Sequence, residues 1–414
     1  MPSPGAPTIA VLATVDTKAA EARYLAAEIV ARGGAARVVD IGLDASHGEP
    51  VAVTADDLAG RAGRRVVDLR AGPRHEAMTT VGEAAGAVLS EWFAAGELHG
   101  SIAVGGNQGT AVAAIAMRHL PIGPPKLIVS TVASGNVRDY VRDSDITMQF
   151  SVGDLLGGPN RVTGMILRRS AAAVVAMATS AATTDPSEDD GAPTVGITAF
   201  GNTEPAVVAA IAHLREGGVA CVPFHASGAC GSAMERLLDD GVLTGVLDLT
   251  THEVLGEIEP ADIYAPVRPG RLTAAGRRGA PQVVVPGGLE YFCFGAPETI
   301  PAAYRDRPVH VHNPYNTNVR TSADDLSAVG RLVAERLNAA RGPVAVLVPT
   351  KGWSGVGSPG GVLHDPDANQ AFVDVLEREL DPRVRLELHD TTINDPAFAS
   401  AAASTLLELM PAPH

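Results

Sequence analysis

The segment 100–115 combines residue types that bind phosphate groups. A short apolar run ends in Gly105-Gly106-Asn107-Gln108-Gly109-Thr110, and an apolar helical pattern follows at once. A glycine-rich turn between a strand and a helix lets backbone N–H groups and the positive end of the helix dipole approach an anion. Asn107 and Thr110 add side-chain donors. The spacing matches neither GxGxxG nor GxxxxGK[ST], so a tight turn without a ligand is an equally good interpretation of this segment alone.

Two further loops of the same kind flank this turn in the sequence. The apolar run that begins at Thr8 is followed by Asp16-Thr17-Lys18, and the run 126–130 is followed by Thr131 and Ser134-Gly135-Asn136. A carboxylate at Asp16 suits Mg²⁺ and an ammonium group at Lys18 suits phosphate, although Asp16 would also cap the next helix. Ligands of open parallel sheets bind beyond the carboxyl ends of the strands. The three loops together therefore predict a nucleotide site.

The C-terminal half places reactive side chains after several of its apolar runs. His225, His252, Glu253 and His312 are predicted to be catalytic, with a structural hydrogen-bonding role as the alternative for each histidine. The spacing of His310 and His312 would also put two imidazoles on one side of a strand, as in metal sites. Contacts to a substrate are predicted for Ser227, Gly228, Asn313, Arg320, Thr321 and Ser354.

Composition limits the class of protein. The chain has 414 residues, of which 46% are hydrophobic, which is too long for one core and predicts two domains. The formal net charge is −15, and the arginine groups at 61–65 and 268–278 are expected to be solvated, so nucleic acid is not expected as a ligand. The three cysteines are widely spaced and predict buried thiols rather than disulfides. We expect a cytoplasmic protein that does not enter a membrane.

Strand and helix patterns alternate along the chain, which is typical of right-handed βαβ units. A polar, acidic stretch with flanking prolines predicts a linker at 183–193. The expected fold is α/β, with two Rossmann-like domains at 1–182 and 194–414, each a mainly parallel sheet flanked by helices. The expected strands lie near 8–14, 36–41, 101–104, 126–130, 145–150, 194–198, 219–224, 244–249, 282–285, 308–312, 343–349 and 384–388.

Many separated motifs resemble those of the Tm-1-like ATP-binding proteins, the UPF0261 family. They include Asp16-Thr-Lys, the 105–110 turn, Leu127-Ile-Val-Ser-Thr-Val-Ala-Ser-Gly-Asn-Val137, Phe224-His-Ala-Ser-Gly228, Asp248-Leu-Thr-Thr251, Val311-His-Asn-Pro314 and Ile393-Asn-Asp-Pro-Ala-Phe398. The family turn is usually Gly-Gly-Ser-Gly-Gly-Thr, so Asn107 and Gln108 are bulkier than the family pattern. The resemblance implies two α/β domains, ATP bound in the N-terminal one, and a homodimer.

These observations predict an ATP- and Mg²⁺-dependent enzyme that acts on a small anionic molecule in a cleft between the domains. Carboxylate activation and phosphotransfer both fit. The predicted nucleotide contacts are Asp16, Thr17, Lys18, Gly105, Gly106, Asn107, Gly109, Thr110, Thr131, Ser134, Gly135 and Asn136, with Asp16 at the metal. Two alternatives stay open, namely a nucleotide-dependent regulatory module without chemistry, and an ATP-independent hydrolase or isomerase that uses the C-terminal histidines.

Overall fold

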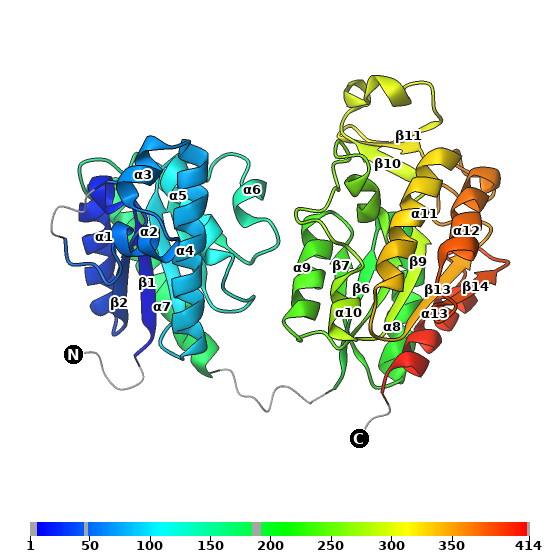
Figure 1. The fold of residues 1–414 in the computed structure, drawn as a ribbon, viewed down its shortest axis with the longest axis horizontal. Helices are drawn as coiled ribbons and strands as arrows, with labels where there is room; N and C mark the ends of the chain where they lie inside the picture. Colours follow the sequence, from blue (N-terminus) through cyan, green and yellow to red (C-terminus); the bar gives the residue numbers. More distant parts are fainter. Residues whose placement is uncertain (1–5, 45–48, 184–191, 412–414) are drawn as a thin grey trace. The chain divides into compact units, whose positions relative to one another are not determined.

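The chain forms two compact units that divide after residue 188, and each is described here by itself (Figure 1). The computed structural model of the protein describes residues 6–44, 49–183 and 192–411. Most of the predicted linker, 183–193, lies outside the described residues.

The N-terminal unit alternates strands and helices around a five-stranded parallel sheet. The sheet has the order β2-β1-β3-β4-β5, in which the chain first adds a strand on one side of β1 and then moves to the other. Its elements are β1 (Thr8–Ala13), α1 (Val15–Val30), β2 (Ala35–Asp40), α2 (Ala55–Arg61), α3 (Val66–Ala71), α4 (Arg74–Ala94), β3 (Gly100–Gly105), α5 (Asn107–Met117), β4 (Lys126–Ser130), α6 (Arg138–Val141), β5 (Thr147–Phe150) and α7 (Arg161–Thr183).

The apolar run of β1 is buried on both faces because helices cover both sides of the sheet. Ile9 and Val11 pack into a core with α1 and α7, whereas Ala10 and Leu12 pack on the opposite face with α4 and α5. The segment Arg161–Ser180 of α7 is long and apolar enough to cross a membrane, but half of its most apolar stretch is buried inside the unit, as in a core helix. The expected cytoplasmic location stays a prediction.

The C-terminal unit has a six-stranded parallel sheet of order β14-β13-β9-β8-β6-β7. α8 and α13 cover one face, and α9 to α12 cover the other. Its elements are β6 (Thr194–Ala199), η2 (Gly201–Thr203), α8 (Glu204–Glu216), β7 (Ala220–His225), α9 (Ala229–Asp239), β8 (Gly245–Thr250), η3 (His252–Glu257), α10 (Ala274–Arg278), β9 (Gln282–Gly287), β10 (Tyr291–Phe294), η4 (Pro297–Thr299), η5 (Ala302–Tyr304), β11 (Val309–Asn313), β12 (Asn316–Arg320), α11 (Ala323–Asn338), β13 (Val344–Pro349), α12 (Pro366–Glu379), β14 (Arg385–His389) and α13 (Pro396–Leu409).

The fold class is confirmed, but one strand lies in a different sheet from the predicted one. The strand expected at 308–312 is β11, which pairs antiparallel with β12 in a separate three-stranded sheet of order β10-β12-β11. β12 has the sequence Asn-Thr-Asn-Val-Arg, whose polar residues resemble a loop, and all five are buried. This small sheet lies beyond the end of the large one (Figure 1).

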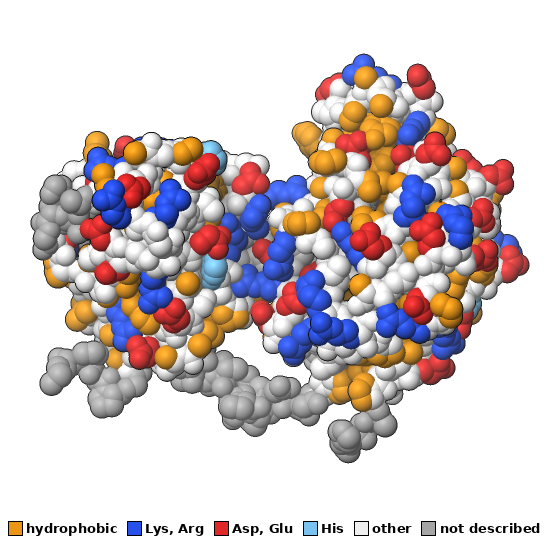
Figure 2. Space-filling model, in the orientation of Figure 1, with side chains coloured by type: hydrophobic (Ala, Val, Ile, Leu, Met, Phe, Trp, Pro, Cys, Tyr) orange, Lys and Arg blue, Asp and Glu red, His pale blue; other side chains and the backbone are white. Residues whose placement is uncertain are grey.

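The burial of some cysteine and arginine residues differs from expectation. All three cysteines are free thiols, but only Cys293 is buried. Lys/Arg and Asp/Glu side chains are interspersed over the visible face of the C-terminal unit (Figure 2). Arg271, expected to be solvated, is fully buried and forms ion pairs with Glu235, Asp248 and Glu253.

Candidate functional sites

A large cavity of the N-terminal unit lies at the point where the strand order reverses. Its volume is about 640 Å³, and the loops after β1, β2 and β3 form its walls together with α3 and α4. Ligands of doubly wound sheets bind at this switch point, between the first strand and the strand where the order turns back. The lining residues are Thr14, Asp16, Thr17, Lys18, Ile41, Gly42, Leu43, Asp44, Leu69, Arg70, Arg74, Met78, Val81, Gly106, Asn107, Gln108, Gly109 and Val112.

The N-terminus of α5 reaches this cavity without a side-chain cap. The first N–H groups of a helix have no partner within the helix, so those of α5 are available to an anion. Three cations line the same cavity. Lys18 stands in a non-helical conformation in the first turns of α1, Arg70 pairs with Asp44 at 2.7 Å, and Arg74 donates to Gln108.

Two carboxylates meet beside Gly42 at the same edge. A Cβ atom at Gly42 would lie 3.0 Å from Oδ1 of Asp40 and 3.3 Å from the carboxyl carbon of Asp16. Burial, together with the charge of Asp16, raises the pKa of Asp40, although the N–H groups of Gly42 and Val15 donate to it. Oδ2 of Asp40 is buried and has no hydrogen-bond partner among the described residues. A cation at this edge would relieve the repulsion between the two carboxylates.

The cavity contains only some of the predicted nucleotide contacts. Thr110 is fully buried, and its hydroxyl lies 2.6 Å from that of Ser130. A Cβ atom at Gly105 would meet the backbone of Gly109 at 3.0 Å, so Gly105 serves the close packing of β3 against α5. Six predicted contacts do not line the cavity, namely Gly105, Thr110, Thr131, Ser134, Gly135 and Asn136.

Asn107 and Gln108, the bulkier residues of the turn, form hydrogen bonds with side chains that are distant in the sequence. The hydroxyl of Tyr140 donates to Oδ1 of Asn107 at 2.9 Å, and Arg74 holds Oε1 of Gln108. The sequence did not indicate Arg70 or Arg74, because α3 and α4 carry no motif. Gly42, which follows a strand end, is the sequence signal that could have indicated the β2 loop.

The C-terminal unit has a smaller pocket beyond the carboxyl ends of two strands of its large sheet. It encloses about 60 Å³ beyond β6 and β7, and the small antiparallel sheet closes it. His225 and His312, two of the predicted catalytic residues, line it together. The full lining is Phe200, Gly201, Asn202, His225, Tyr264, Tyr291, Cys293, His312, Asn316 and Asn318.

His252 lies behind this pocket as a buried cation. Nδ1 lies 2.8 Å from the carbonyl oxygen of Gly288 and Nε2 lies 3.1 Å from Oδ2 of Asp262, so both ring nitrogens face acceptors. Burial works to lower the pKa of His252, but the carboxylate of Asp262 and, after it, Cys293 together more than offset burial, and the pKa lies well above its usual value. The ring centroid lies 4.9 Å from that of Phe200 and 5.5 Å from that of Tyr291, and both ring pairs are tilted. His252 therefore supports the pocket wall rather than facing a ligand.

His225 differs from His252 in its protonation. Partial burial, and then the charge of His252, lowers the pKa of His225. Its ring lies 5.2 Å from that of Phe200 and 6.1 Å from that of Tyr264. A neutral imidazole at the edge of a pocket can accept a proton near neutral pH.

The loop that contains Ser227 and Gly228, predicted to contact a substrate, already binds a carboxylate of the protein itself. The N–H groups of Gly228 and Gly231 donate to the carboxylate of Glu253, which also accepts from Arg271 at 2.6 Å. Burial raises the pKa of Glu253, and Arg271 opposes that rise. Glu253 is fully buried, so the prediction that it is catalytic is corrected to a structural role. Ser227 donates back to the carbonyl of His225 and does not line the pocket.

Three predicted substrate contacts, Arg320, Thr321 and Ser354, belong to a buried hydrogen-bond network around Glu290. Arg320 donates to the carbonyl of Glu290, to Thr321 and to Asn369, and Ser354 donates to the Glu290 carboxylate. All five residues of this network are at most 4% exposed, so none of them meets a ligand from solvent.

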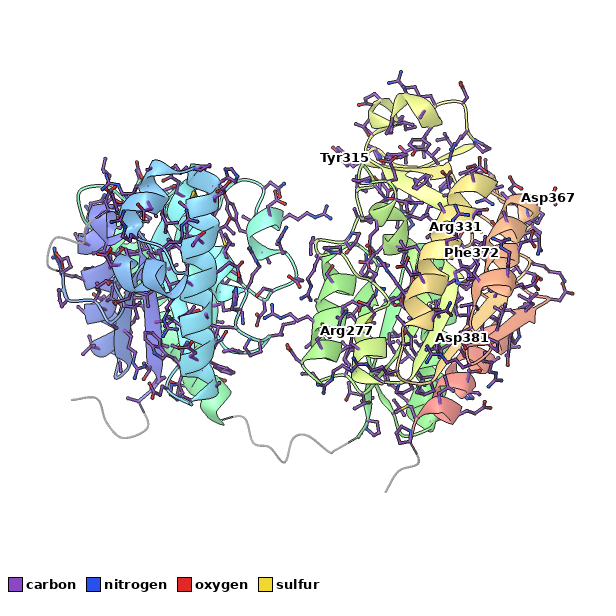
Figure 3. The ribbon with its side chains drawn as sticks, viewed as in Figure 1. Arg277, Tyr315, Arg331, Asp367, Phe372 and Asp381 are labelled. Carbon is purple, nitrogen blue, oxygen red and sulfur yellow. The ribbon has the colours of Figure 1, made fainter. Side chains whose placement is uncertain are left out.

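Asn313 organises a turn instead of binding a substrate. Its side chain accepts from the N–H of Tyr315 at 2.8 Å, which holds the tight connection between β11 and β12. Tyr315 itself is 81% exposed at the tip (Figure 3). The rings of His310 and His312 are 6.2 Å apart, and no group of three metal-ligating side chains occurs among the residues that the structure describes.

The fold defines a two-domain α/β protein with a cavity beyond the strand ends of each large sheet. The family models described as the N-terminal and C-terminal domains of the Uncharacterised protein family (UPF0261) match residues 7–183 and 192–410, and the chain belongs to that family. A UPF0261 protein of Mesorhizobium japonicum is 39% identical over 409 residues, which span 96% of this chain and 98% of that protein.

A plant relative resembles the chain over part of its own length. The ToMV susceptible protein tm-1(GCR26) of Solanum lycopersicum is 34% identical over 346 residues, which are 82% of this chain and 45% of that protein. Among solved structures, the glycosyltransferase SnogD from Streptomyces nogalater covers 97% of this chain and 99% of its own at 11% identity. Its TM-score of 0.19 is too low to carry an argument.

Proposed function

We propose that the N-terminal cavity binds ATP with Mg²⁺. The observation that carries the proposal is the uncapped N-terminus of α5 in a cavity of about 640 Å³ that Lys18, Arg70 and Arg74 also line. Helix N-termini and cations together favour the charge of a polyphosphate. Leu43, Leu69, Met78 and Val81 give the cavity an apolar wall against which a purine base can pack.

The carboxylates beside Gly42 fit the magnesium ion of this proposal. Mg²⁺ is usually held by one or two carboxylates, several waters and the phosphates of the nucleotide, rather than by a cage of protein ligands. Asp16 would contact the ion or its waters, and the unpartnered Oδ2 of Asp40 would accept from such a water. ATP supplies an electrophilic phosphoryl group when bound.

We further propose that the protein is an enzyme whose small anionic substrate binds in the C-terminal pocket. A neutral His225 would take a proton there, and the His252–Asp262 pair would fix the rings around it. Carboxylate activation and phosphotransfer remain the proposed reactions. The same imidazole supports a second candidate, an ATP-independent hydrolase or isomerase. The homodimer and the cleft between the domains stay predictions.

A thermal-shift panel separates these proposals. ATP with Mg²⁺ should raise the melting temperature more than ATP with EDTA, and adenosine should have a smaller effect than either. Release of ADP or phosphate is then measured with a series of small carboxylic acids. Absence of any nucleotide-dependent shift would refute the ATP site, whereas a shift without product release for any acid would favour the regulatory module.

A further inference from the structure

The floor of the C-terminal pocket contains a polar atom that lacks a partner. Asn318 lines the pocket and is 2% exposed. Its Oδ1 atom is buried and has no hydrogen-bond partner among the described residues. A buried acceptor that stays unpaired destabilises the protein, so a ligand that donates a hydrogen bond here would gain affinity.

Neighbouring residues hold the nitrogen end of the Asn318 amide. Its Nδ2 donates to Sγ of Cys293 at 3.1 Å and to Oδ1 of Asn316 at 3.3 Å, and Nδ2 of Asn316 in turn donates to Tyr264 at 3.1 Å. In this arrangement Nδ2 of Asn318 has two acceptors, and Oδ1 is the atom without a partner among the described residues. The amide therefore offers an acceptor to the ligand.

The rim of the pocket offers the opposite chemistry. His225 and His312 are the exposed imidazoles of the lining, whereas Tyr291, Cys293 and Asn318 are buried, so the histidines mark the mouth and the others the floor. Imidazole N–H groups donate hydrogen bonds and tolerate an anion.

The nearest carboxylate does not oppose an anion in the pocket. No acidic side chain belongs to the described lining. Asp262 lies behind the lining, where it accepts from His252 and from the N–H groups of Tyr264 and Cys293. Its negative charge is thus balanced within the protein.

We propose that this pocket binds a small hydroxy acid, whose hydroxyl donates to Oδ1 of Asn318 and whose carboxylate accepts from the imidazoles at the mouth. The enclosed volume of about 60 Å³ admits only a few non-hydrogen atoms, so the hydroxyl-bearing end is inside. This inference rests on the C-terminal part of the proposed function, and it requires nothing of the nucleotide cavity.

The test compares two probes that differ only in the hydroxyl group. Binding of lactate and of propionate to the full chain is measured by ligand-observed NMR titration, with both enantiomers of lactate. One of the enantiomers should bind at least about tenfold more tightly than propionate, which corresponds to about 1.4 kcal/mol. Equal binding of lactate and propionate, or binding of neither, would overturn the proposal without need of a variant.

Two variants of β12 then assign the preference to one atom. Asn318→Leu should bind lactate and propionate equally. Thr317→Val is the matched control, because Thr317 also has a buried unpartnered oxygen but lies outside the lining, and it should keep the preference for lactate. A preference that survives in a folded Asn318→Leu protein would contradict the role of Asn318. ATP-dependent thermal shifts are recorded in parallel, so a failed nucleotide proposal and a failed hydroxy-acid proposal give different results.

Discussion

Substitution of Gly106 by valine tests the nucleotide cavity with little risk to the fold. A Cβ atom at this position would meet only Oγ1 of Thr131, at 3.7 Å, and the φ angle of −83° suits any residue. Gly106 nevertheless lines the cavity at the N-terminus of α5. The two methyl groups of valine would occupy space that a phosphate needs to reach the free N–H groups, so we expect a folded protein that no longer binds ATP.

The size of the expected shift in melting temperature follows from the linkage between ATP binding and folding. ATP at one hundred times its dissociation constant stabilises the native state by about 2.7 kcal/mol. In a domain of this size about 1 kcal/mol shifts the melting temperature by roughly 2–4 °C, so the wild-type shift should be roughly 5–11 °C. Differential scanning calorimetry with and without ATP and Mg²⁺ should show that shift in the wild type and none in Gly106→Val.

The control is a second glycine-to-valine change away from the cavity. Gly60 lies in α2 with nothing within 4 Å of its Cβ position. Gly60→Val should retain the whole ATP-dependent shift. An unchanged shift in Gly106→Val would remove the α5 turn from the site and refute the reasoning above.

Three other changes test the site and its supports. Lys18→Ala should weaken ATP roughly tenfold and adenosine hardly at all in calorimetric titrations, because only the phosphates gain from the ammonium group; equal losses would make Lys18 structural. Gly231→Ala should lower the free energy of unfolding in urea by at least about 2 kcal/mol, because its Cβ would lie 1.6 Å from Oε2 of Glu253, whereas Gly201→Ala, in open space, should change it little. Because the pKa of His252 is raised in the folded state, its stabilisation is complete below about pH 6.5 and is lost as pH rises through the folded value. Urea titrations from pH 6 to 9 should thus show a wild-type advantage over His252→Gln that shrinks with pH, and a constant advantage would disprove the charged imidazole.

The strand ends of the N-terminal unit were predictable because their signals are local. An apolar run buried on both faces of a parallel sheet, followed by glycine and then a helical pattern, identifies β3 and α5 from the sequence alone. The same reasoning placed Asp16, Lys18 and Gly106 beside one another, since parallel strands bring their carboxyl ends to one edge. The strand order, and with it the switch point, follows from which helix covers which face and has no local signature.

The sequence by itself determined the alternation of strands and helices and therefore the α/β class. Only the tertiary structure decided which polar residues face a ligand and which face each other. Glu253 and Arg320 have the same types and strand-end positions as binding residues, yet both are satisfied by partners that are distant in sequence. Asn318 looks like a loop residue in the sequence, yet the antiparallel sheet buries it at the floor of a pocket. The physical reason is that a buried polar group must find a partner, and whether that partner is internal depends on contacts between segments far apart in the chain.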